Sequence, residues 1–457
     1  MQKIIYRSTN RKSRLVTFKE ALLKGQAPDC GLYVPTKIPR LTKEEHEFIL
    51  NKKYHEIAFT VLNKFLHDEI GENDLKKITK EAYNFDVPLE KINYNSFLMR
   101  LDRGPTASFK DFAARLMARL MHYFASKDDM RLTVLTATSG DTGGAVADAF
   151  HGLKGISVIV LFPEKEVYEL QRKQMTTLGG NVRAFGVKGN FDDCQAMVKQ
   201  AFNDKELDKI SLTSANSINF GRLLPQAVYY FYAHSMLSGK NAVFSVPSGN
   251  FGNLMGGVIA REMGLNVERF IAAVNENDEF PSFLKTGSYR PVQPSRKCSS
   301  SAMNVGHPSN LARLVDLYGG WLCDERDRNG KIVKKGVLKK KPDMKKLNRD
   351  FASFSITNKD TDKTIKDFYS KYEKLLEPHG AVAWCALEKY SKIQKFNAAV
   401  SLETADPAKF PSEITRLLGI KPKIPKSLIG LDKKKEKFEV IKNYYKHLKS
   451  RLISLKT

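Results

Sequence analysis

The middle of the chain alternates short apolar, β-branched runs with stretches whose apolar residues recur at helical spacing. The short runs predict buried strands, and the periodic stretches predict amphipathic helices. This alternation favours right-handed βαβ units around a parallel sheet, so the expected fold class is α/β. The predicted strands are 131–137, 156–162, 182–187 and 242–246, and the predicted helices are 142–150, 168–178 and 194–202.

The two ends of the chain and one internal segment follow other patterns. Residues 1–92 predict a small opening module, with a short strand at 3–6 and a helix that begins near Thr17. Residues 324–344 are polar and have no clear period, which predicts an inserted or mobile surface segment. The tail beyond Pro425 has a helical face that we expect to dock on the body: Phe438, Ile441, Tyr444, Tyr445 and Leu448.

Composition is that of an ordinary globular protein except for its charge. Of 457 residues, 42% are hydrophobic and 27% are charged, which excludes a disordered, collagen-like or disulfide-scaffold chain. No run approaches the roughly 18 apolar residues of a membrane-spanning helix. The 75 Lys and Arg residues exceed the 50 Asp and Glu residues by 25. Much of this excess lies in residues 331–346 and 421–457.

Such a positive balance has two interpretations. One is a surface that binds nucleic acid or another acidic partner, and the other is a solvated, lysine-rich exterior. We favour the solvated exterior because no zinc-finger, aromatic RNA-binding or basic-zipper motif accompanies the lysines. The sequence thus leads us to expect neither a nucleic-acid nor a membrane partner.

The cysteines bear on compartment and metal binding. There are five, widely scattered and without a CxxC pair, so neither a disulfide framework nor a zinc site is expected. This usage fits a reducing compartment, and we expect a cytoplasmic protein. His151, His307 and His379 stand alone in the sequence and favour structural roles over catalysis or metal binding.

Two turns rich in glycine and hydroxyl residues follow predicted strands and precede predicted helices. They are Thr138-Ser139-Gly140-Asp141-Thr142-Gly143-Gly144 and Pro247-Ser248-Gly249-Asn250-Phe251-Gly252-Asn253. Backbone N–H groups at the start of a helix form an anion site, so each turn could hold a carboxylate or a phosphate. Neither matches the GxxxxGK[ST] or GxGxxG patterns of nucleotide sites. A tight turn that needs glycine explains either one alone equally well.

A third element is the segment 104–111, with the sequence GPTASFKD. Pro105 and the small polar residues interrupt regular structure before a helix that begins near Asp111. Lys110 lies at this junction, between Phe109 and Phe112. A lysine beside a helix N-terminus and apolar rings has a lowered pKa and can serve as a Schiff-base amine. A solvated surface lysine is the ordinary alternative.

Four segments, in this order and spacing, resemble the threonine synthase family: GPTASFKDFAARL, TATSGDTGGAVADAF, NSINFGRLLPQ and PSGNFGN. The opening STNRKSRLVTFKEALLKGQAPDCGLYVP and the late segment ETADPAKF extend the resemblance almost end to end. It begins within the first ten residues, so we expect no transit peptide despite the acid-poor start. Members are pyridoxal 5′-phosphate lyases of fold type II, the class of the tryptophan synthase β subunit.

The resemblance implies a role for each matching residue. Lys110 would bind the cofactor covalently and move protons along the substrate, and the Thr404 hydroxyl would bond the pyridine nitrogen. The cradle for the cofactor phosphate would be Ser248, Gly249, Asn250, Phe251, Gly252 and Asn253. The substrate carboxylate would lie against Ser139, Gly140, Asp141, Thr142 and Gly143. The substrate phosphate would lie against Asn216, Ser217 and Arg222, and an arginine fork can bond it bidentately.

Two residues depart from the family pattern. Asp406 stands where a histidine is expected, beside the segment assigned to the cofactor ring. Cys30 stands where glycine is common. Neither change removes a residue that the implied chemistry needs.

The resemblance implies a fold-type II enzyme with two parallel-sheet α/β domains, the active site between them and a small N-terminal module. The expected domains are an N-terminal module (1–92), a large cofactor domain (93–128 and 223–420), a small domain (129–222) and a basic helical tail (421–457). No metal is expected, and the chain would act as a monomer or homodimer.

The implied reaction is O-phospho-L-homoserine plus water giving L-threonine plus phosphate, the last step of threonine biosynthesis. One alternative is a related phospholyase that gives 2-oxobutanoate, ammonia and phosphate from the same substrate. A serine/threonine dehydratase is less favoured because of the phosphate-binding match at 216–222. A non-catalytic nucleic-acid-binding protein is the alternative from a different class.

Overall fold

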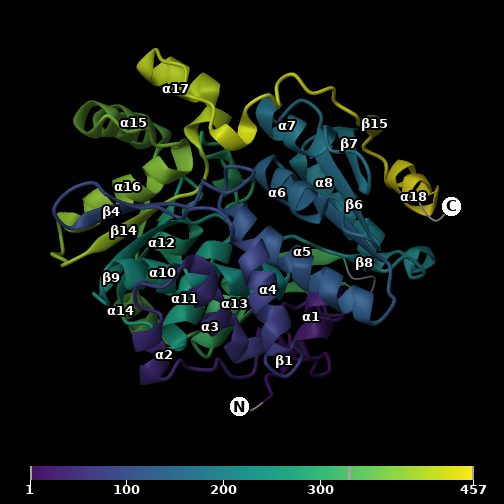
Figure 1. The fold of residues 1–457 in the computed structure, drawn as a ribbon, viewed down its shortest axis with the longest axis horizontal. Helices are drawn as coiled ribbons and strands as arrows, with labels where there is room; N and C mark the ends of the chain where they lie inside the picture. The colour runs from purple at the N-terminus through teal and green to yellow at the C-terminus, as the bar shows by residue number, and fades with distance from the viewer. Residues whose placement is uncertain (1–2, 328–330, 455–457) are drawn as a thin grey trace.

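Two β-sheets organise the molecule, and the computed structural model describes residues 3–327 and 331–454 of it (Figure 1). In this part of the chain one sheet has the strand order β13-β10-β9-β14-β4-β3 and another the order β15-β7-β6-β5-β8. The pairs β1–β2 and β11–β12 form two small antiparallel sheets. The strands are β1 (Tyr6–Ser8), β2 (Tyr33–Pro35), β3 (Leu89–Lys91), β4 (Ser96–Arg100), β5 (Leu132–Ala137), β6 (Ile156–Pro163), β7 (Val182–Lys188), β8 (Leu212–Thr213), β9 (Ala242–Pro247), β10 (Val267–Val274), β11 (Trp321–Arg326), β12 (Ile332–Lys340), β13 (Phe351–Ser355), β14 (Ala399–Glu403) and β15 (Glu439–Lys442).

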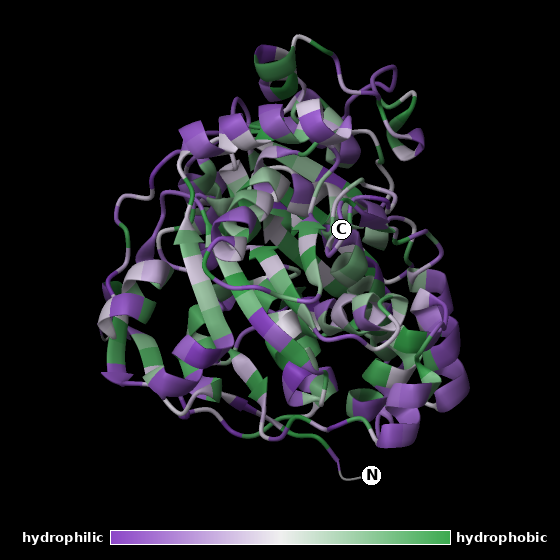
Figure 2. Ribbon diagram, turned by 90° about the vertical axis from the view of Figure 1, so that its left-hand side faces the viewer, coloured by the Kyte–Doolittle hydropathy of each residue, from purple (hydrophilic) through white to green (hydrophobic). Residues whose placement is uncertain are grey.

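Helices connect the strands and form the outside of the molecule. Figure 2 shows largely apolar strands inside and more polar helices at the periphery, as expected for sheets covered on their faces. The helices are α1 (Phe18–Lys24), α2 (Lys43–Phe48), α3 (Tyr54–Leu66), α4 (Glu72–Ala82), α5 (Lys110–Lys127), α6 (Asp141–Phe150), α7 (Glu169–Thr176), α8 (Phe191–Asn203), α9 (Phe220–Leu223), α10 (Val228–Met236), α11 (Gly252–Glu262), α12 (Glu279–Thr286), α13 (Leu311–Leu317), α14 (Met344–Asp350), α15 (Asn358–Tyr372), α16 (Pro378–Ser391), α17 (Pro411–Leu418) and α18 (Tyr445–Ser454).

The predicted parallel α/β architecture is confirmed. The strands β5, β6, β7 and β15 and the short β8 pair only in parallel, and β4, β14, β9, β10 and β13 do so in the other sheet. Within these two sheets only β3 runs antiparallel to its neighbour. The predicted strands and helices of the middle of the chain all form. Helix α8 begins three residues early, at Phe191, because Asn190 and Asp193 form a capping box there.

The tail differs from the prediction of one continuous helical face. Residues Glu439–Lys442 form β15, which pairs in parallel with β7, and helix α18 begins only at Tyr445. The open edge of β7 offers unpaired backbone groups, and strand pairing satisfies them where a helix could not. The predicted docking is confirmed, since Ile441 and Leu448 are buried in the core beneath the five-stranded sheet.

The segment at 324–344, predicted as an inserted or mobile surface segment without clear period, contains regular structure over much of its length. Strands β11 and β12 pair there as an antiparallel ladder that buries Leu322, while residues 328–330 lie outside the described residues. The alternation of apolar and polar residues is irregular in these strands, because several register shifts interrupt the ladder and Gly336 has a φ of +64°. Near the N-terminus the predicted strand at 3–6 lies slightly later, at Tyr6–Ser8.

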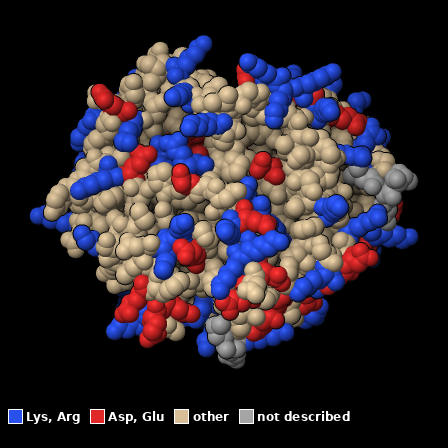
Figure 3. Space-filling view, viewed as in Figure 1, with Lys and Arg blue, Asp and Glu red and all other residues tan. Residues whose placement is uncertain are grey.

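On the face drawn in Figure 3, Lys and Arg side chains are scattered in several places, with Asp and Glu side chains among them. Along residues 3–327 and 331–454, no helix is long and apolar enough to cross a membrane. The same residues contain no group of His, Cys, Asp and Glu side chains that could hold a metal ion.

Cys30 has a left-handed backbone, with a φ of +63°. The turn before β2 fixes this conformation, because the Cys30 N–H donates to Ala27 O at 2.8 Å and its carbonyl accepts from the Gln26 amide at 2.9 Å. A side chain with a Cβ costs about 1–2 kcal/mol in this region, whereas glycine adopts it freely. The departure from the glycine common at this position therefore stores strain.

We expect Cys30→Gly to stabilise the folded protein by about 0.5–1 kcal/mol, because relief of strain exceeds the extra entropy of glycine in the unfolded chain. The measurement is the midpoint of urea unfolding at an unchanged slope. Cys30→Ala is the matched control: it removes the sulfur but keeps the Cβ, so no gain should follow. An equal gain in both variants would assign the effect to the thiol.

Candidate active site

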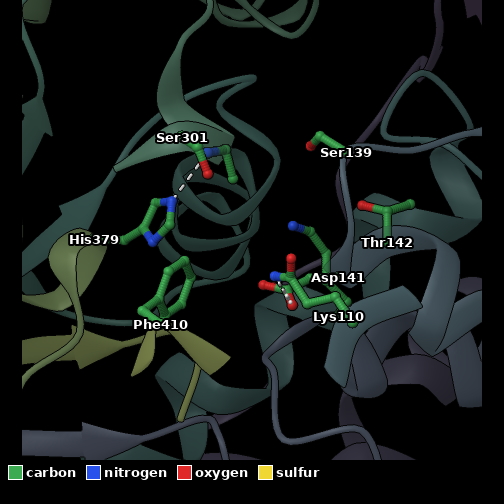
Figure 4. A pocket seen from close by; sticks show the side chains of 9 residues that line it. Lys110, Ser139, Asp141, Thr142, Ser301, His379 and Phe410 are labelled. Carbon is green, nitrogen blue, oxygen red and sulfur yellow. Dashed lines mark hydrogen bonds between the residues drawn. The ribbon is translucent and has the colours of Figure 1, made fainter. Parts of the chain in front are cut away.

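One pocket lies where loops from both sheets meet, at the carboxyl ends of parallel strands. The loop after β4 leads to Lys110, the loop after β9 is the turn at 247–253, and Thr404 follows β14. From the other sheet, the loop after β5 carries Ser139. Ligand sites of open α/β sheets lie at this edge. The lining residues are Lys110, Ser139, Asp141, Thr142, Gln171, Ser301, Ala302, His379 and Phe410 (Figure 4).

The segment before Lys110 is held in a fixed shape by Asp111. Its buried carboxylate accepts from the backbone N–H and the hydroxyl of Thr106, at 2.8 and 2.6 Å. Gly104 is required because a Cβ there would lie 2.4 Å from that carboxylate. Ala107 has a left-handed φ of +53°. Non-glycine residues in this region concentrate at functional sites, where the surrounding structure enforces them.

Lys110, the first residue of α5, lies between the two halves of the pocket (Figure 4). Burial lowers the pKa of Lys110 to about 8, and the charges of Arg222 and Lys409 act in the same direction. The charge of Asp141 opposes this shift. With such a pKa, roughly a tenth of the amine is neutral at pH 7, far more than for an ordinary lysine. The predicted lowering of the Lys110 pKa thus has a physical basis in this pocket.

Asp141 is held by Lys409, whose side chain is completely buried. The Lys409 ammonium lies 2.6 Å from one Asp141 oxygen and also donates to Thr106 O at 2.8 Å. The Gln171 amide donates to the same carboxylate at 2.9 Å. Burial alone would raise the pKa of Asp141, but the charges of Lys409 and Lys110 outweigh it and hold that pKa below its ordinary value. Asp141 therefore stays ionised beside Lys110.

The predicted carboxylate loop at 138–143 is organised around the Thr138 hydroxyl. That oxygen accepts from the N–H groups of Gly140 and Gly143, at 3.0 and 2.8 Å. These two amides therefore shape the loop, while the side chains of Ser139 and Thr142 line the pocket. Helix α6 begins at Asp141, so its positive end faces the same space.

The predicted cradle at 248–253 joins β9 to the N-terminus of α11. Gly249 packs against the main chain of the pocket-lining segment, since a Cβ there would lie 2.8 Å from Ala302 O. Phe251 has a left-handed φ of +61°, and its ring packs edge-to-face on Phe280. The amide oxygen of Asn250 accepts from Ser309. The turn thus places the N-terminus of α11 next to the Ala302 segment.

Arg313 and Asn310 join the cradle to the predicted phosphate-binding segment at 216–222. The Asn310 amide donates to Asn250 O at 2.9 Å and to Ser217 O at 3.2 Å. The buried Arg313 guanidinium donates to Ser217 O, Ile218 O, Asn310 Oδ1 and, in the N-terminal part, Tyr33 O. Burial lowers its pKa to about 9. No carboxylate among the described residues bonds the Arg313 guanidinium, so neutral carbonyl and amide oxygens stabilise its charge.

Arg222 is buried and incompletely bonded. Its Nη1 has no hydrogen-bond partner within the described part of the chain. Burial lowers the pKa of Arg222 to about 10. Asn216 is fixed by a hydrogen bond from Thr136, in the strand that leads to the carboxylate loop. A buried guanidinium with a free donor fits an anionic ligand.

Thr404 lies next to the Lys110 segment, because its carbonyl accepts from Phe109 N at 2.8 Å. Its hydroxyl donates to Glu377 Oε1 at 3.0 Å. The other Glu377 oxygen accepts from His379 Nδ1 at 2.5 Å, and His379 Nε2 accepts from Ala302 N at 3.0 Å. Both ring nitrogens of His379 are therefore engaged in holding the pocket wall.

Several residues in and beside the pocket were not predicted from the sequence. Lys409 and Phe410 belong to the segment ETADPAKF but had no role assigned to them, and Gln171, Ser301 and Ala302 were not singled out. His379 was considered structural, and its bonds agree with that, although it also lines the pocket. Asp406, which stands where the family pattern has a histidine, accepts from Ala408 N at 2.9 Å and so caps the short turn that carries Lys409. The small polar run at 299–301 was the available signal for the Ala302 segment.

Comparison with known proteins gives the family. The chain matches the model of the threonine synthase N terminus over residues 5–83 and that of pyridoxal-phosphate dependent enzymes over 83–327. It also matches the threonine synthase C-terminal model over 380–451. Threonine synthase of Haemophilus influenzae is 40% identical over 417 residues, covering 90% of this chain and 91% of that protein. The chain belongs to the threonine synthase family.

Other members of the threonine synthase family agree in sequence and in structure. The Escherichia coli K12 enzyme is 36% identical and covers 90% of this chain and 91% of its own. A PLP-bound threonine synthase from Brucella melitensis has a TM-score of 0.90, 36% identity, and coverage of 98% of this chain and 99% of its own. The yeast enzyme has a TM-score of 0.89 at 30% identity, covering 99% of each chain.

These comparisons confirm several of the predictions. The resemblance to threonine synthases, the fold-type II α/β class with an N-terminal module, and the PLP-dependent lyase activity are confirmed. Pyridoxal 5′-phosphate is the cofactor. The roles of individual residues and the domain boundaries stay predictions.

We expect the protein freed of cofactor to recapture pyridoxal 5′-phosphate at a rate that rises with pH and levels off above about 8, because only the neutral Lys110 amine reacts. Lys409→Met should move this midpoint upward by about one unit, since it removes a nearby positive charge and frees Asp141 to favour the ammonium. The measurement is the pH dependence of the rise in the visible cofactor band. Lys421→Met, an exposed change in the tail, is the control. An unmoved midpoint in Lys409→Met would contradict the assignment.

Proposed function

We propose that this member of the threonine synthase family converts O-phospho-L-homoserine and water to L-threonine and phosphate. The observation that carries this substrate is Arg222, a buried guanidinium with a free donor, whose charge acts on Lys110. A pocket that held only an amino acid and the cofactor would not need a third buried cation beside Lys110 and Lys409. A phosphate on the substrate would satisfy it.

The residues present fit the cofactor. The lowered pKa of Lys110 gives an amine able to bond an aldehyde. The turn with Gly249, where a Cβ would not fit against Ala302, leads into the start of α11, where backbone amides can bind a phosphate. We assign the cradle to residues 248–253. We place the ring beside Thr404, whose carbonyl is bonded to the residue before Lys110. Bound there, pyridoxal phosphate withdraws electrons from the substrate α-carbon and so acidifies its proton.

The chain's own groups then bind and orient the substrate. We assign the substrate carboxylate to the 139–143 loop, where the hydroxyls of Ser139 and Thr142 and the positive end of α6 face the pocket. The substrate phosphate lies against Asn216, Ser217 and Arg222, so phosphate leaves while bonded to a cation. A proton leaves the β-carbon, phosphate departs from the γ-carbon, a proton adds at the γ-carbon, and water then adds at the β-carbon.

Lys110 moves the protons. About a tenth of its Nζ is neutral at pH 7 and can take the α-proton, and as an ammonium it can return a proton to a neighbouring carbon. Ionised Asp141, fixed by Lys409, stabilises that ammonium between the two transfers. The walls formed by His379 and Phe410 limit the access of water other than the molecule that adds.

We further propose a cytoplasmic enzyme that acts as a monomer or homodimer. The supporting observation is the free state of all five cysteines, which fits a reducing compartment.

The purified protein with O-phospho-L-homoserine should yield threonine and phosphate in equal amounts, and its spectrum should carry a visible cofactor band. Lys110→Ala should lose that band and reduce turnover at least about a thousandfold, because it removes both the covalent attachment and the proton carrier. Both products are assayed in one tube. Phosphate with 2-oxobutanoate and ammonia in place of threonine would identify a phospholyase. Full activity of Lys110→Ala would refute the site.

Arg222→Met should lower kcat/KM for the phosphorylated substrate roughly 10- to 100-fold, the effect of losing one charge-assisted bond. The cofactor band should persist, since the cradle lies on another loop. The matched control is Arg183→Met, an exposed arginine on β7 that should behave as wild type. If Arg222→Met lost the cofactor and kept its KM for substrate, Arg222 would belong to the cofactor site.

A further inference from the structure

The C-terminal segment crosses from one sheet to the other. Helix α17 is fixed beside the six-stranded sheet by Arg416. Its two terminal nitrogens, Nη1 and Nη2, donate to the Asp362 carboxylate of α15 at 2.9 and 3.0 Å. From there the chain passes over α7 and adds β15 to the edge of β7, as the yellow trace in Figure 1 shows. Helix α18 then packs on α8, where Lys449 pairs with Asp204 at 2.9 Å.

Residues 432–437 bind the outer side of α7. Arg172 forms a two-pronged ion pair with Glu436, at 2.9 and 3.0 Å, and the Thr176 hydroxyl donates to the same carboxylate at 2.8 Å. The backbone N–H of Lys437 donates to Thr176 O at 2.6 Å. Lys173 donates to the carbonyl of Asp432. The hydrogen bond from Arg172 lowers the pKa of Glu436, so the carboxylate is charged at neutral pH.

The opposite side of α7 builds the pocket. Gln171 donates to Asp141 at 2.9 Å, and Gln174 donates to Thr106 O, in the Lys110 segment, also at 2.9 Å. Two glycines of the carboxylate loop pack closely against this helix. A Cβ on Gly140 would lie 2.4 Å from the Gln171 oxygen, and one on Gly143 would lie 2.8 Å from the Met175 sulfur. A shift of α7 would therefore displace the loop.

An eight-residue helix with polar residues on both sides is weakly fixed by apolar burial alone. Its position depends on directional bonds, and those on the outer side come from the tail. The cradle at 248–253, by contrast, lies on the other sheet and touches neither α7 nor residues 432–437 in the bonds described above.

We propose that residues 432–437 set the position of α7, and that Glu436 is a positioning residue for the 139–143 loop and hence for binding of the substrate carboxylate. This rests on the proposed function, which assigns that loop to the substrate. The tail then affects substrate binding through α7 without contact with the reacting atoms. Cofactor binding does not depend on the tail.

The test compares two tail variants, Glu436→Ala and Glu439→Ala. Glu439 is the matched control: it lies three residues away and is held by Arg451 through an ion pair of similar form, but both side chains are exposed, and they bond each other rather than α7. Glu436→Ala should raise the KM for O-phosphohomoserine about tenfold, with kcat and the cofactor band within about twofold of wild type. Glu439→Ala should match wild type.

Charge reversal checks that the Arg172 pair is responsible. Each single variant, Arg172→Glu or Glu436→Arg, should raise the KM. The double variant should bring the KM most of the way back to the wild-type value. An unchanged KM in Glu436→Ala, or a rise in KM accompanied by loss of the cofactor band, would overturn the proposal, because the first denies coupling and the second indicates general damage.

A second readout does not need catalysis. Hydrogen–deuterium exchange of residues 138–144 should be faster in Glu436→Ala than in Glu439→Ala, and exchange of 248–253 should be equal in the two. If wild type made no threonine, the proposed function would fail while this comparison still tested the tail. Equal exchange of 138–144 in both variants would overturn the positioning role.

Discussion

The burial of several positive charges around one pocket is the constraint on which the rest of the structure depends. Arg222 and Lys409 both act on buried Lys110, and the carboxylate of Asp141 is bonded to Lys409. Desolvation of a cation costs several kcal/mol unless bonds replace water. Lys409 bonds Asp141 and the Thr106 carbonyl, Lys110 has a lowered pKa, and Arg222 has a donor without a partner among the described residues. Such a site favours anionic ligands.

The surrounding structure supports these cations with oxygen atoms of the backbone. Thr106 offers its carbonyl to Lys409 and Gln174 while Asp111 holds its other polar groups. Outside the pocket, the Arg313 guanidinium is stabilised in the same way. It donates to a carbonyl of the N-terminal part, Tyr33 O, and to one of the segment assigned to the substrate phosphate, Ile218 O. Two of the non-glycine residues with a left-handed backbone, Ala107 and Phe251, lie in loops that we assign to the site, whereas others, such as Cys30, lie elsewhere.

The two sheets contribute different parts of this site. The six-stranded sheet supplies Lys110, the cradle and Thr404, and the five-stranded sheet supplies the carboxylate loop and, through α7, Gln171. The parts assigned to the cofactor thus lie on one body and the parts assigned to the substrate mostly on the other. The C-terminal segment joins the two bodies, which gives a basic tail a structural purpose that its lysines do not suggest. Its acidic residue Glu436 carries that contact.

Local sequence determined the parallel α/β class and the glycine-rich turns, because periodicity and turn chemistry depend on residues near in the chain. Motifs in register added the family, the cofactor and the role assigned to Lys110, which on local grounds resembles a solvated surface lysine. Only the tertiary structure decided that Lys409 would neutralise Asp141, that Gln171 would line the pocket, and that residues 439–442 would be a strand. Those outcomes depend on partners between 30 and 268 residues away along the chain or on an open sheet edge. A lysine or glutamine has no local signature of the carboxylate it will meet, and an edge strand forms only where another strand leaves its backbone unpaired.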